Sequence, residues 1–477
     1  MDNTYDVVVI GAGPVGENVA DRIRAADLTV AVVESELVGG ECSYWACMPS
    51  KALLRPGAAR SDAARVEGAR EAVTGPLDTA AVLARRDRFA SHWKDDGQVA
   101  WLSGVGADLV RGEGRLDGPR RVRVRQPDGA ELLLTARHAV VLSTGSRALL
   151  PPLPGIDQAR PWTSREATSA AHAPGRLAVV GGGVVGVEMA TAWQALGSQV
   201  TMLVRGEGLL PQLEPFAGEL VAAGLTDAGV VVRTGVSVTE LRRPDPDGPV
   251  EVLLDDGSRL EADEILFATG RAPRTDDLGL ETVGLAPGRR LTVDDHCRVT
   301  DVPGGWLWAT GDANHRAPLT HQGKYQARIA GAAIAALAAG QPLDPAPWGP
   351  HTATADTAAV PQVVFTDPEV AAVGLTAAQA ARAGLRTRVV DYDLAQVAGA
   401  GLYADGYRGH ARMVVDEDRG RLVGVTFAGA GVAELLHSAT VAVAAEVPLD
   451  RLWHAVPAYP TISEIWLRLL EAYRDQG

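Results

Sequence analysis

Short apolar runs followed by glycine recur along the chain and are typical of parallel strands buried on both faces. Asp6–Ile10 is one such run, and the pattern after it predicts a helix over about 14–25 and a strand over Thr29–Val33. A second unit of the same kind begins with the run Leu177–Val180 and ends with a strand over Gln199–Val204. The pattern predicts an α/β protein with two Rossmann-like units.

Each unit carries a glycine motif between its first strand and its helix, GAGPVG at 11–16 and GGGVVG at 181–186. In this motif the first glycine makes the turn, the second lets the backbone approach a pyrophosphate, and the third lets helix and strand pack closely. The three positions are Gly11, Gly13 and Gly16 in the first unit and Gly181, Gly183 and Gly186 in the second. Each motif therefore predicts a dinucleotide site.

The residue that ends the second strand differs between the two units. Glu34 stands 23 residues after Gly11, where a carboxylate can bond a ribose hydroxyl. Arg205 stands 24 residues after Gly181, and a cation there suits the 2′-phosphate of NADP rather than the free hydroxyl of NAD. A solvated arginine without a ligand is the alternative interpretation. The pattern thus favours NADPH over NADH at the second site.

Two cysteines five residues apart, Cys42 and Cys47, lie in the segment GGECSYWACMPSK at 39–51. Five residues of regular helix rise about 7.5 Å, more than the roughly 4.4–6.8 Å that a disulfide spans between α-carbons. Pro49 lacks an N–H for the carbonyl of Trp45, so a bent first turn is one way for the sulfurs to meet. A metal site is poorly supported, because the only other cysteine is Cys297 and no histidine is near in sequence. Inert thiols and a redox couple both stay open.

Length and composition limit the class of protein. The chain has 477 residues, of which 46% are hydrophobic and 22% charged, as in a soluble protein of about three domains. A net charge of −14 argues against a nucleic-acid or acidic-membrane partner. The first strand begins by Tyr5, and no apolar stretch is long enough to span a bilayer. We therefore expect a cytoplasmic protein, in which a disulfide is more often catalytic than structural.

The chain resembles, nearly end to end, the pyridine nucleotide-disulfide oxidoreductases, the family of lipoamide dehydrogenase, glutathione reductase and mercuric reductase. The motifs that carry the resemblance are GAGPVG, the cysteine segment with its PSK, GGGVVGVE, ATGRAP, ATGD and PQVVFTDPEVAAVGLT at 361–376. The resemblance implies an FAD-binding domain over 1–150 and 272–345 and an NAD(P)H-binding domain over 151–271. An α+β dimerisation domain would follow over 346–477, with strands near 363, 413 and 423 and helices over 431–446 and 462–473.

The resemblance also implies a path for electrons. Hydride from NADPH would pass through FAD to a Cys42–Cys47 disulfide and on to a disulfide substrate. Cys42 would attack the substrate, and Cys47 would be the thiolate on the flavin side. Lys51 would pair with Glu188 next to the flavin. Further FAD contacts are implied for Gly40, Lys51, Gly114, Gly145 and Asp312, and Gly270 would lie beside the nicotinamide nucleotide. Asp312 capping the next helix is the alternative.

The C-terminal motif departs from the family pattern. Most disulfide-reducing relatives read His-Pro-Thr-x-x-Glu, whereas 459–464 read YPTISE, with Tyr459 in the place of the histidine and Glu464 retained. A phenol with a pKa of about 10 is a poor general base at pH 7. His454 reaching the site is one alternative, and Tyr459 donating a proton or orienting the substrate is another. Mercuric reduction by the family mechanism needs a C-terminal cysteine pair, and no cysteine follows Cys297.

In relatives the dimerisation domain pairs two chains, so Tyr459 and Glu464 would complete the active site of the partner. We therefore expect a homodimer with a shared active site that reduces a small-molecule or protein-bound disulfide. A flavin reductase for a quinone or metal ion is one alternative function. A flavoprotein subunit of a multienzyme complex is another.

Overall fold

The computed structural model describes residues 3–475, which form two compact units. The first unit contains the residues up to Pro49, Asp87–Ala148 and Arg271–Thr357, and the second contains Ser50–Arg86, Leu149–Gly270 and the residues from Ala358 onward. The second unit therefore combines the predicted NAD(P)H-binding and dimerisation domains with 50–86 of the predicted FAD-binding domain. The division into three functional domains stays a prediction.

The first unit is built on a seven-stranded sheet with the order β3-β2-β1-β6-β5-β4, in which β16 also pairs with β6. β3, β2, β1, β6 and β16 pair in parallel, and β5 and β4 extend the sheet antiparallel. The strands are β1 (Thr4–Ile10), β2 (Val30–Glu34), β3 (Asp108–Arg111), β4 (Glu113–Leu116), β5 (Arg121–Arg125), β6 (Glu131–Leu142) and β16 (Leu307–Ala309). A separate ribbon pairs β7 (Ser146–Ala148) with β15 (Arg271–Pro273).

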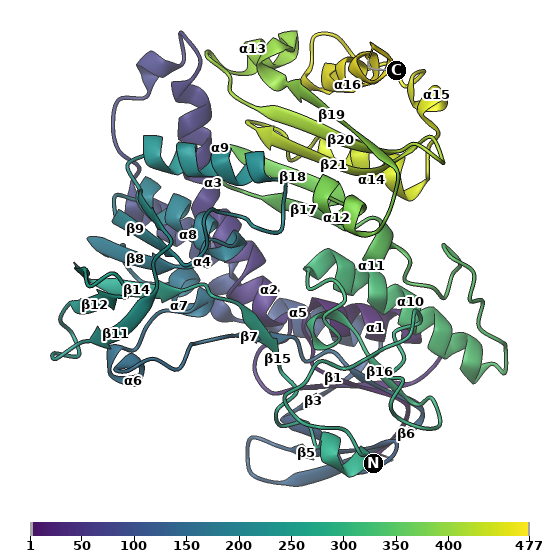
Figure 1. The fold of residues 1–477 in the computed structure, drawn as a ribbon. Helices are drawn as coiled ribbons and strands as arrows, with labels where there is room; N and C mark the ends of the chain where they lie inside the picture. The colour runs from purple at the N-terminus through teal and green to yellow at the C-terminus, as the bar shows by residue number, and fades with distance from the viewer. Residues whose placement is uncertain (1–2, 476–477) are drawn as a thin grey trace. The chain divides into compact units, whose positions relative to one another are not determined.

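Two long helices, α1 (Pro14–Arg24) and α10 (Thr320–Ala338), lie side by side against this sheet (Figure 1). Their apolar faces share one core with β1, β2 and β6, and Cys297 is completely buried in that core. The other helical segments that belong wholly to this unit are α2 (Gly40–Tyr44), η2 (Ser91–Trp93), α5 (Asp96–Gly104), η3 (Leu280–Val283) and η4 (Gly311–Ala313). The predicted helix and strand of the first motif agree with α1 and β2 to within one residue at each end.

The second unit contains a parallel sheet with the order β10-β9-β8-β14 and a three-stranded antiparallel sheet, β11-β12-β13. The strands are β8 (Arg176–Val180), β9 (Gln199–Val204), β10 (Val231–Thr234), β11 (Val238–Arg242), β12 (Val250–Leu254), β13 (Arg259–Ala262) and β14 (Glu264–Phe267). The helices of this part are η1 (Arg70–Ala72), α4 (Thr79–Phe89, which runs past the unit boundary), α6 (Ile156–Ala159), α7 (Ser164–Ser169), α8 (Val184–Ala195) and α9 (Pro215–Asp227). β9 has the bounds that the apolar pattern predicts.

The C-terminal part of the second unit is a five-stranded antiparallel sheet with the order β17-β18-β21-β20-β19. Its strands are β17 (Pro361–Val364), β18 (Glu369–Gly374), β19 (Thr387–Asp393), β20 (His410–Asp416) and β21 (Arg421–Gly429). Its helical segments are α12 (Ala377–Arg382), η5 (Leu394–Gln396), α13 (Ala398–Tyr403), α14 (Leu436–Ala444), α15 (Leu449–Leu452), η6 (Ile462–Glu464) and α16 (Ile465–Asp475). The three predicted strands are present, and the two predicted helices correspond to α14 and to η6 with α16.

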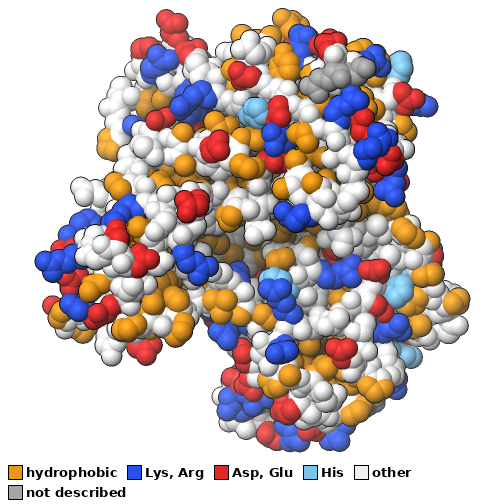
Figure 2. All heavy atoms as spheres, in the orientation of Figure 1, with side chains coloured by type: hydrophobic (Ala, Val, Ile, Leu, Met, Phe, Trp, Pro, Cys, Tyr) orange, Lys and Arg blue, Asp and Glu red, His pale blue; other side chains and the backbone are white. Residues whose placement is uncertain are grey.

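Two further helices cross or adjoin the unit boundaries, α3 (Cys47–Ala64) and α11 (Ala355–Ala358). Within 3–475, no helix is both long and apolar enough to cross a membrane. Acidic and basic side chains are interspersed on the face drawn in Figure 2, and the excess of acidic residues gives the chain its net charge of −14.

Candidate active site

The first glycine turn leaves room for a ligand only at its middle position. A Cβ on Gly11, whose φ is +99°, would lie 2.5 Å from the carbonyl oxygen of Ser143, and one on Gly16 would lie 1.9 Å from the carbonyl oxygen of Gly11. Gly13 is different, because the nearest atom to its Cβ would be the Cα of Gly40 at 4.0 Å. The backbone is therefore open at the amino end of α1, where a helix favours a phosphate.

Glu34 lies at the carboxyl end of β2 and closes this turn. Its carboxylate accepts hydrogen bonds from the backbone N–H groups of Ala12 at 2.7 Å and of Glu36 at 2.8 Å. Burial raises the pKa of Glu34, against the effect of these hydrogen bonds. The open glycine turn and the fixed carboxylate together fit the pyrophosphate and ribose of a dinucleotide such as FAD.

Asp312 lies in η4, at the carboxyl end of β16, and accepts a hydrogen bond from the hydroxyl of Ser146. Its loop is fixed because the N–H of Gly311 donates to the side chain of Gln326 at 2.7 Å. The alternative that Asp312 caps the next helix is wrong. Thr310 is the N-cap of η4, Leu319 is the N-cap of α10, and the carboxylate of Asp312 bonds Ser146 instead.

The other glycines implied for FAD have different surroundings. Gly40 begins α2, and its Cα faces Gly13. Gly145 lies in the turn before β7, where its carbonyl accepts from the N–H of Arg274 at 2.9 Å. Gly114 lies within β4, where a Cβ would be 3.0 Å from Val33. Close packing in the sheet is therefore a sufficient reason for a glycine at 114.

Cys42 and Cys47 lie on two separate helices. α2 ends at Tyr44, Trp45 leaves the helical region with φ −137° and ψ 3°, and α3 begins at Cys47. The interruption removes the geometric obstacle of a continuous helix. Pro49, considered above as one way of bending the helix, does not cause the interruption, because the break precedes it and Pro49 occupies the first turn of α3, where its missing N–H costs nothing.

Both cysteines are free thiols, and their side chains are within hydrogen-bonding distance of each other. The Sγ of Cys47 is 3.3 Å from the hydroxyl oxygen of Thr320, the first residue of α10. Hydrogen bonding to Cys47 and burial raise the pKa of the Cys42 thiol, as does the charge of Cys47, whereas Thr320 and Lys324 oppose this rise. The arrangement is that of a reduced dithiol whose sulfurs can form a bond.

Aromatic residues fix the loop between the two cysteines. The hydroxyl of Tyr44 donates to the carbonyl of Val38 at 2.9 Å, and the indole of Trp93 donates to the carbonyl of Tyr44 at 3.1 Å. Tyr44 and Trp45 pack edge to face with ring centroids 5.7 Å apart. These contacts stabilise the non-helical connection that separates Cys42 from Cys47.

In the second unit, Lys51 forms the ion pair with Glu188 that the resemblance implies. The Nζ of Lys51 is 2.6 Å from Oε2 of Glu188, whose side chain is only 4% exposed. The other carboxylate oxygen accepts from the N–H of Phe365 at 3.1 Å, and the ammonium lies 5.0 Å from the centroid of the Phe365 ring. A buried carboxylate needs such partners, and here they fix the position of the lysine.

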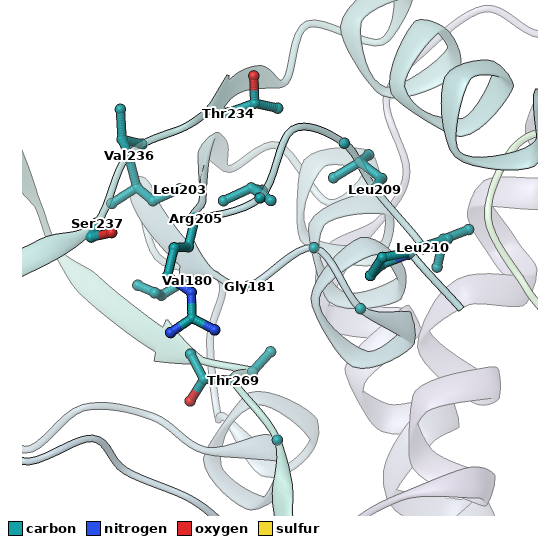
Figure 3. A pocket seen from close by; sticks show the side chains of 18 of the residues that line it. Val180, Gly181, Leu203, Arg205, Leu209, Leu210, Thr234, Val236, Ser237 and Thr269 are labelled. Atoms are coloured by element: carbon teal, nitrogen blue, oxygen red, sulfur yellow. The ribbon is translucent and has the colours of Figure 1, made fainter. Parts of the chain in front are cut away.

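The second glycine turn opens into a pocket of about 1320 Å³ (Figure 3). A Cβ on Gly181 would lie 2.5 Å from the carbonyl oxygen of Ala268, and one on Gly186 would lie 2.2 Å from that of Gly181. Gly183 has nothing within 4 Å of its Cβ position, so the turn is again open at its middle glycine. The pocket lining includes Gly181, Gly183, Arg205, Glu207, Thr269 and Gly270.

Arg205 enters this pocket from the end of β9, and Figure 3 shows its guanidinium pointing towards Thr269. Within residues 3–475 the guanidinium makes no hydrogen bond or ion pair, so all its donors are available to a ligand. Glu207, which sequence reasoning missed, lines the same pocket. Its position two residues after Arg205 was the signal that could have found it.

The residues of the C-terminal motif differ in their exposure to solvent. Tyr459 is 75% exposed and His454 is also exposed, whereas Glu464 is 5% exposed and accepts from Arg468 at 2.6 Å. Glu464 is thus paired with a cation on α16 and with neither Tyr459 nor His454. Val456, between the two exposed residues, is 86% exposed.

Comparison with known proteins identifies the family. Residues 5–333 match the family model described as pyridine nucleotide-disulphide oxidoreductase, and residues 360–469 match the dimerisation domain of that family. The chain belongs to this family. It is therefore an enzyme, an FAD-dependent disulfide oxidoreductase that uses a pyridine nucleotide.

The alignments with similar proteins extend over almost the whole chain. Dihydrolipoyl dehydrogenase 3 of Pseudomonas aeruginosa is 33% identical over 484 residues, which is 97% of each protein. The mercuric reductase of Streptomyces lividans is 31% identical over 468 residues, with 96% of this chain and 94% of that protein covered. These similarities extend the family assignment over both compact units.

Solved structures have the same fold. The crystal structure of LpdA from Mycobacterium tuberculosis has a TM-score of 0.82 at 25% identity, with 99% of both chains covered. The HOCl-induced flavoprotein disulfide reductase RclA from Escherichia coli has a TM-score of 0.82 at 24% identity and covers 98% of this chain and 99% of its own. At that identity the second likeness shows the fold alone.

Proposed function

We propose that this oxidoreductase uses NADPH to reduce a disulfide and that the Cys42–Cys47 pair transfers the electrons to the substrate. The observation that carries the proposal is the position of the two thiols. They lie on separate helices, within hydrogen-bonding distance of each other, in the same compact unit as the first glycine turn. The location that we expect for this reaction is the cytoplasm, where a dithiol is kept available by reduction.

The first unit supplies a site that fits FAD. Gly13 leaves the backbone open for a pyrophosphate, Glu34 would bond the ribose, and Asp312 would receive a polar part of the cofactor. Bound FAD supplies two-electron transfer between a nicotinamide ring and a dithiol. Lys51, paired with Glu188, would provide a fixed positive charge, as the family resemblance implies.

Cys42 and Cys47 perform the exchange with the substrate. The thiolate of Cys42 attacks one sulfur of the substrate disulfide, and the other sulfur leaves as a thiolate. Cys47 then attacks the sulfur of Cys42, which closes the Cys42–Cys47 bond and releases the second substrate thiolate. Each released thiolate takes one proton, so one substrate disulfide becomes two thiols at the expense of two electrons from the dithiol.

Tyr459 is assigned to the substrate side of the partner's active site, where its hydroxyl donates a proton to the leaving thiolate or orients the disulfide. The match to the dimerisation domain and the exposure of Val456 and Tyr459 support a homodimer in which this surface is covered. Glu464, bonded to Arg468, positions the segment, and His454 is the second candidate for the proton donor.

NADPH rather than NADH is proposed because Arg205 lines the nucleotide pocket with all of its donors unpaired. A guanidinium suits a phosphate, which it can bind through two parallel hydrogen bonds. No carboxylate occupies the position that corresponds to Glu34 in the first unit.

Replacing Cys42 by Ser tests the route. We expect Cys42→Ser to lose NADPH-dependent turnover of every disulfide in a panel of small and protein-bound disulfides while NADPH still reduces the flavin. Cys297→Ser is the matched control, because Cys297 is buried and outside the pair. Undiminished disulfide turnover in Cys42→Ser would show that the electrons leave by another route, for example directly to a quinone or metal ion.

A further inference from the structure

Lysine is rare in this chain. Of the 45 basic residues only three are lysines, Lys51, Lys94 and Lys324, and the rest are arginines. Lys51 follows Cys47 on α3. The backbone carbonyl of Lys94 lies 3.5 Å from the hydroxyl of Tyr44, the last residue of α2. Lys324 lies on α10 and makes no hydrogen bond or ion pair with any residue in 3–475.

The geometry of α10 directs Lys324 towards the thiols. Thr320, whose hydroxyl oxygen is 3.3 Å from the Sγ of Cys47, is the first residue of the helix, and Lys324 follows four residues later on the same face. Side chains on a helix lean towards its amino end, so the lysine extends back over the turn that contains Thr320. Lys324 is half-buried there.

We propose that Lys324 supplies a positive charge that favours the thiolate form of the Cys42–Cys47 pair. This role rests on the proposed function of the pair as the redox couple. An opposite charge nearby favours the charged form of an ionisable group, and the thiolate is the form that attacks a disulfide. Lys324 lowers the pKa of Cys42, whereas Cys47 and burial raise it.

The C-terminal motif shows why such a charge matters in this chain. A histidine side chain can carry a positive charge, whereas a phenol such as that of Tyr459 cannot. Tyr459 therefore cannot supply a positive charge to the dithiol. The ammonium group of a lysine can do so.

The ionisable groups around the dithiol and Lys324 come from four helices and a strand. α2 and α3 contribute the thiols themselves, and α10 contributes His321 and Arg328 beside Lys324. α1 contributes Glu17, which is 8% exposed and has one carboxylate oxygen without a hydrogen bond. Burial raises the pKa of Glu17 to about 7, Lys324 lowers it, and the charge of Glu34 on β2 raises it. Glu17 therefore ionises close to pH 7 and then opposes the effect of Lys324 on the thiols.

The test is the pH dependence of alkylation of the dithiol by iodoacetamide in the holoenzyme, reduced anaerobically with a phosphine so that no turnover is needed. We expect Lys324→Gln to raise the apparent pKa of the more reactive thiol by about one pH unit, which slows alkylation at pH 7 roughly tenfold. Lys324→Arg keeps the charge and should restore the profile of the unmodified enzyme. Glu17→Gln should move the profile in the opposite direction by a smaller amount.

Arg328→Gln is the matched control, because it removes a positive charge from an exposed position one turn further along α10. An unchanged profile in Lys324→Gln, or an equal shift in Arg328→Gln, would overturn the assignment. Flavin content and thermal unfolding establish that each variant is folded, and Lys324→Met replaces Lys324→Gln if the latter does not fold. The readout is independent of disulfide turnover, so the proposed function and this assignment can fail separately.

Discussion

The two glycine turns have nearly the same backbone and opposite charges. Gly11 and Gly181 both have positive φ, +99° and +118°, and a Cβ on either would lie 2.5 Å from a carbonyl oxygen. After the second strand, however, Glu34 accepts two backbone N–H groups, whereas Arg205 has no partner in 3–475. Backbone sterics thus fix the turn in both units, and the side chain at the end of the second strand differs in charge between them.

The residue after the third glycine of the turn also differs in polarity between the two units. It is Val187 in the second unit, completely buried in an apolar core, and Glu17 in the first, where a carboxyl group is buried with one oxygen unpaired. Burying a carboxylate without a partner is costly. The first unit therefore accepts a less stable arrangement, which the second unit avoids, next to the helix that contacts the thiols.

The largest effect should come from a substitution that places a Cβ against the backbone of a glycine turn. Gly186→Ala places a Cβ 2.2 Å from the carbonyl oxygen of Gly181, so we expect a loss of about 3 kcal/mol or more of unfolding free energy. Gly183→Ala has open space and should keep its stability while NADPH binding weakens, because the methyl group occupies the place of the pyrophosphate. Thermal unfolding and NADPH titration measure the two effects, and equal stability of the two variants would contradict the assignment of roles.

Glu17→Gln tests the contrast with Val187 through pH. The pKa of Glu17 rises from 4.5 to about 7 on folding, so its contribution to stability is fully present below pH 4.5 and is lost as pH rises through 7. Relative to the unmodified enzyme, the variant should therefore become more stable as pH rises. We expect the difference between their unfolding free energies to change by roughly 2–3 kcal/mol from pH 5 to pH 8. Thermal midpoints at the two pH values measure this, with the exposed Glu281→Gln as control. A difference independent of pH would be inconsistent with a buried, titrating Glu17.

Arg205→Leu tests the contrast with Glu34 and should have the smallest effect. We expect the KM for NADPH to rise roughly tenfold to thirtyfold, the equivalent of about 1.4–2 kcal/mol, because charged hydrogen bonds to the 2′-phosphate are lost. The KM for NADH should change little. Arg259→Leu, with a side chain 77% exposed on β13, is the control. Equal rises for both nucleotides would indicate that Arg205 does not discriminate between them.

The elements that the sequence predicts well are those with strong local patterns. The bounds of β9, the near agreement of α1 and β2 and the steric requirements of the glycine turns all follow from apolar periodicity and backbone geometry. The pairing of Lys51 with Glu188 joins residues far apart in the chain, and only the resemblance to a family predicted it.

Other features depend on packing that no local pattern contains. The separation of the cysteines into α2 and α3 depends on Tyr44 and on Trp93, which lies 49 residues further along the chain. The position of Thr320 beside Cys47 brings together residues 273 apart. Lys324 could not be recognised before α10 was placed, because its relevance comes from the face that it shares with Thr320.

The most direct test of the central claim is the number of thiols that NADPH generates. The oxidised enzyme is incubated anaerobically with NADPH, quenched with iodoacetamide and analysed by mass spectrometry of the peptide that contains Cys42 and Cys47. The account predicts that NADPH converts this peptide from the unreactive disulfide to a form alkylated at both cysteines, in step with oxidation of the nucleotide. Oxidation of NADPH with bleaching of the flavin, while both cysteines stay unreactive, would contradict it.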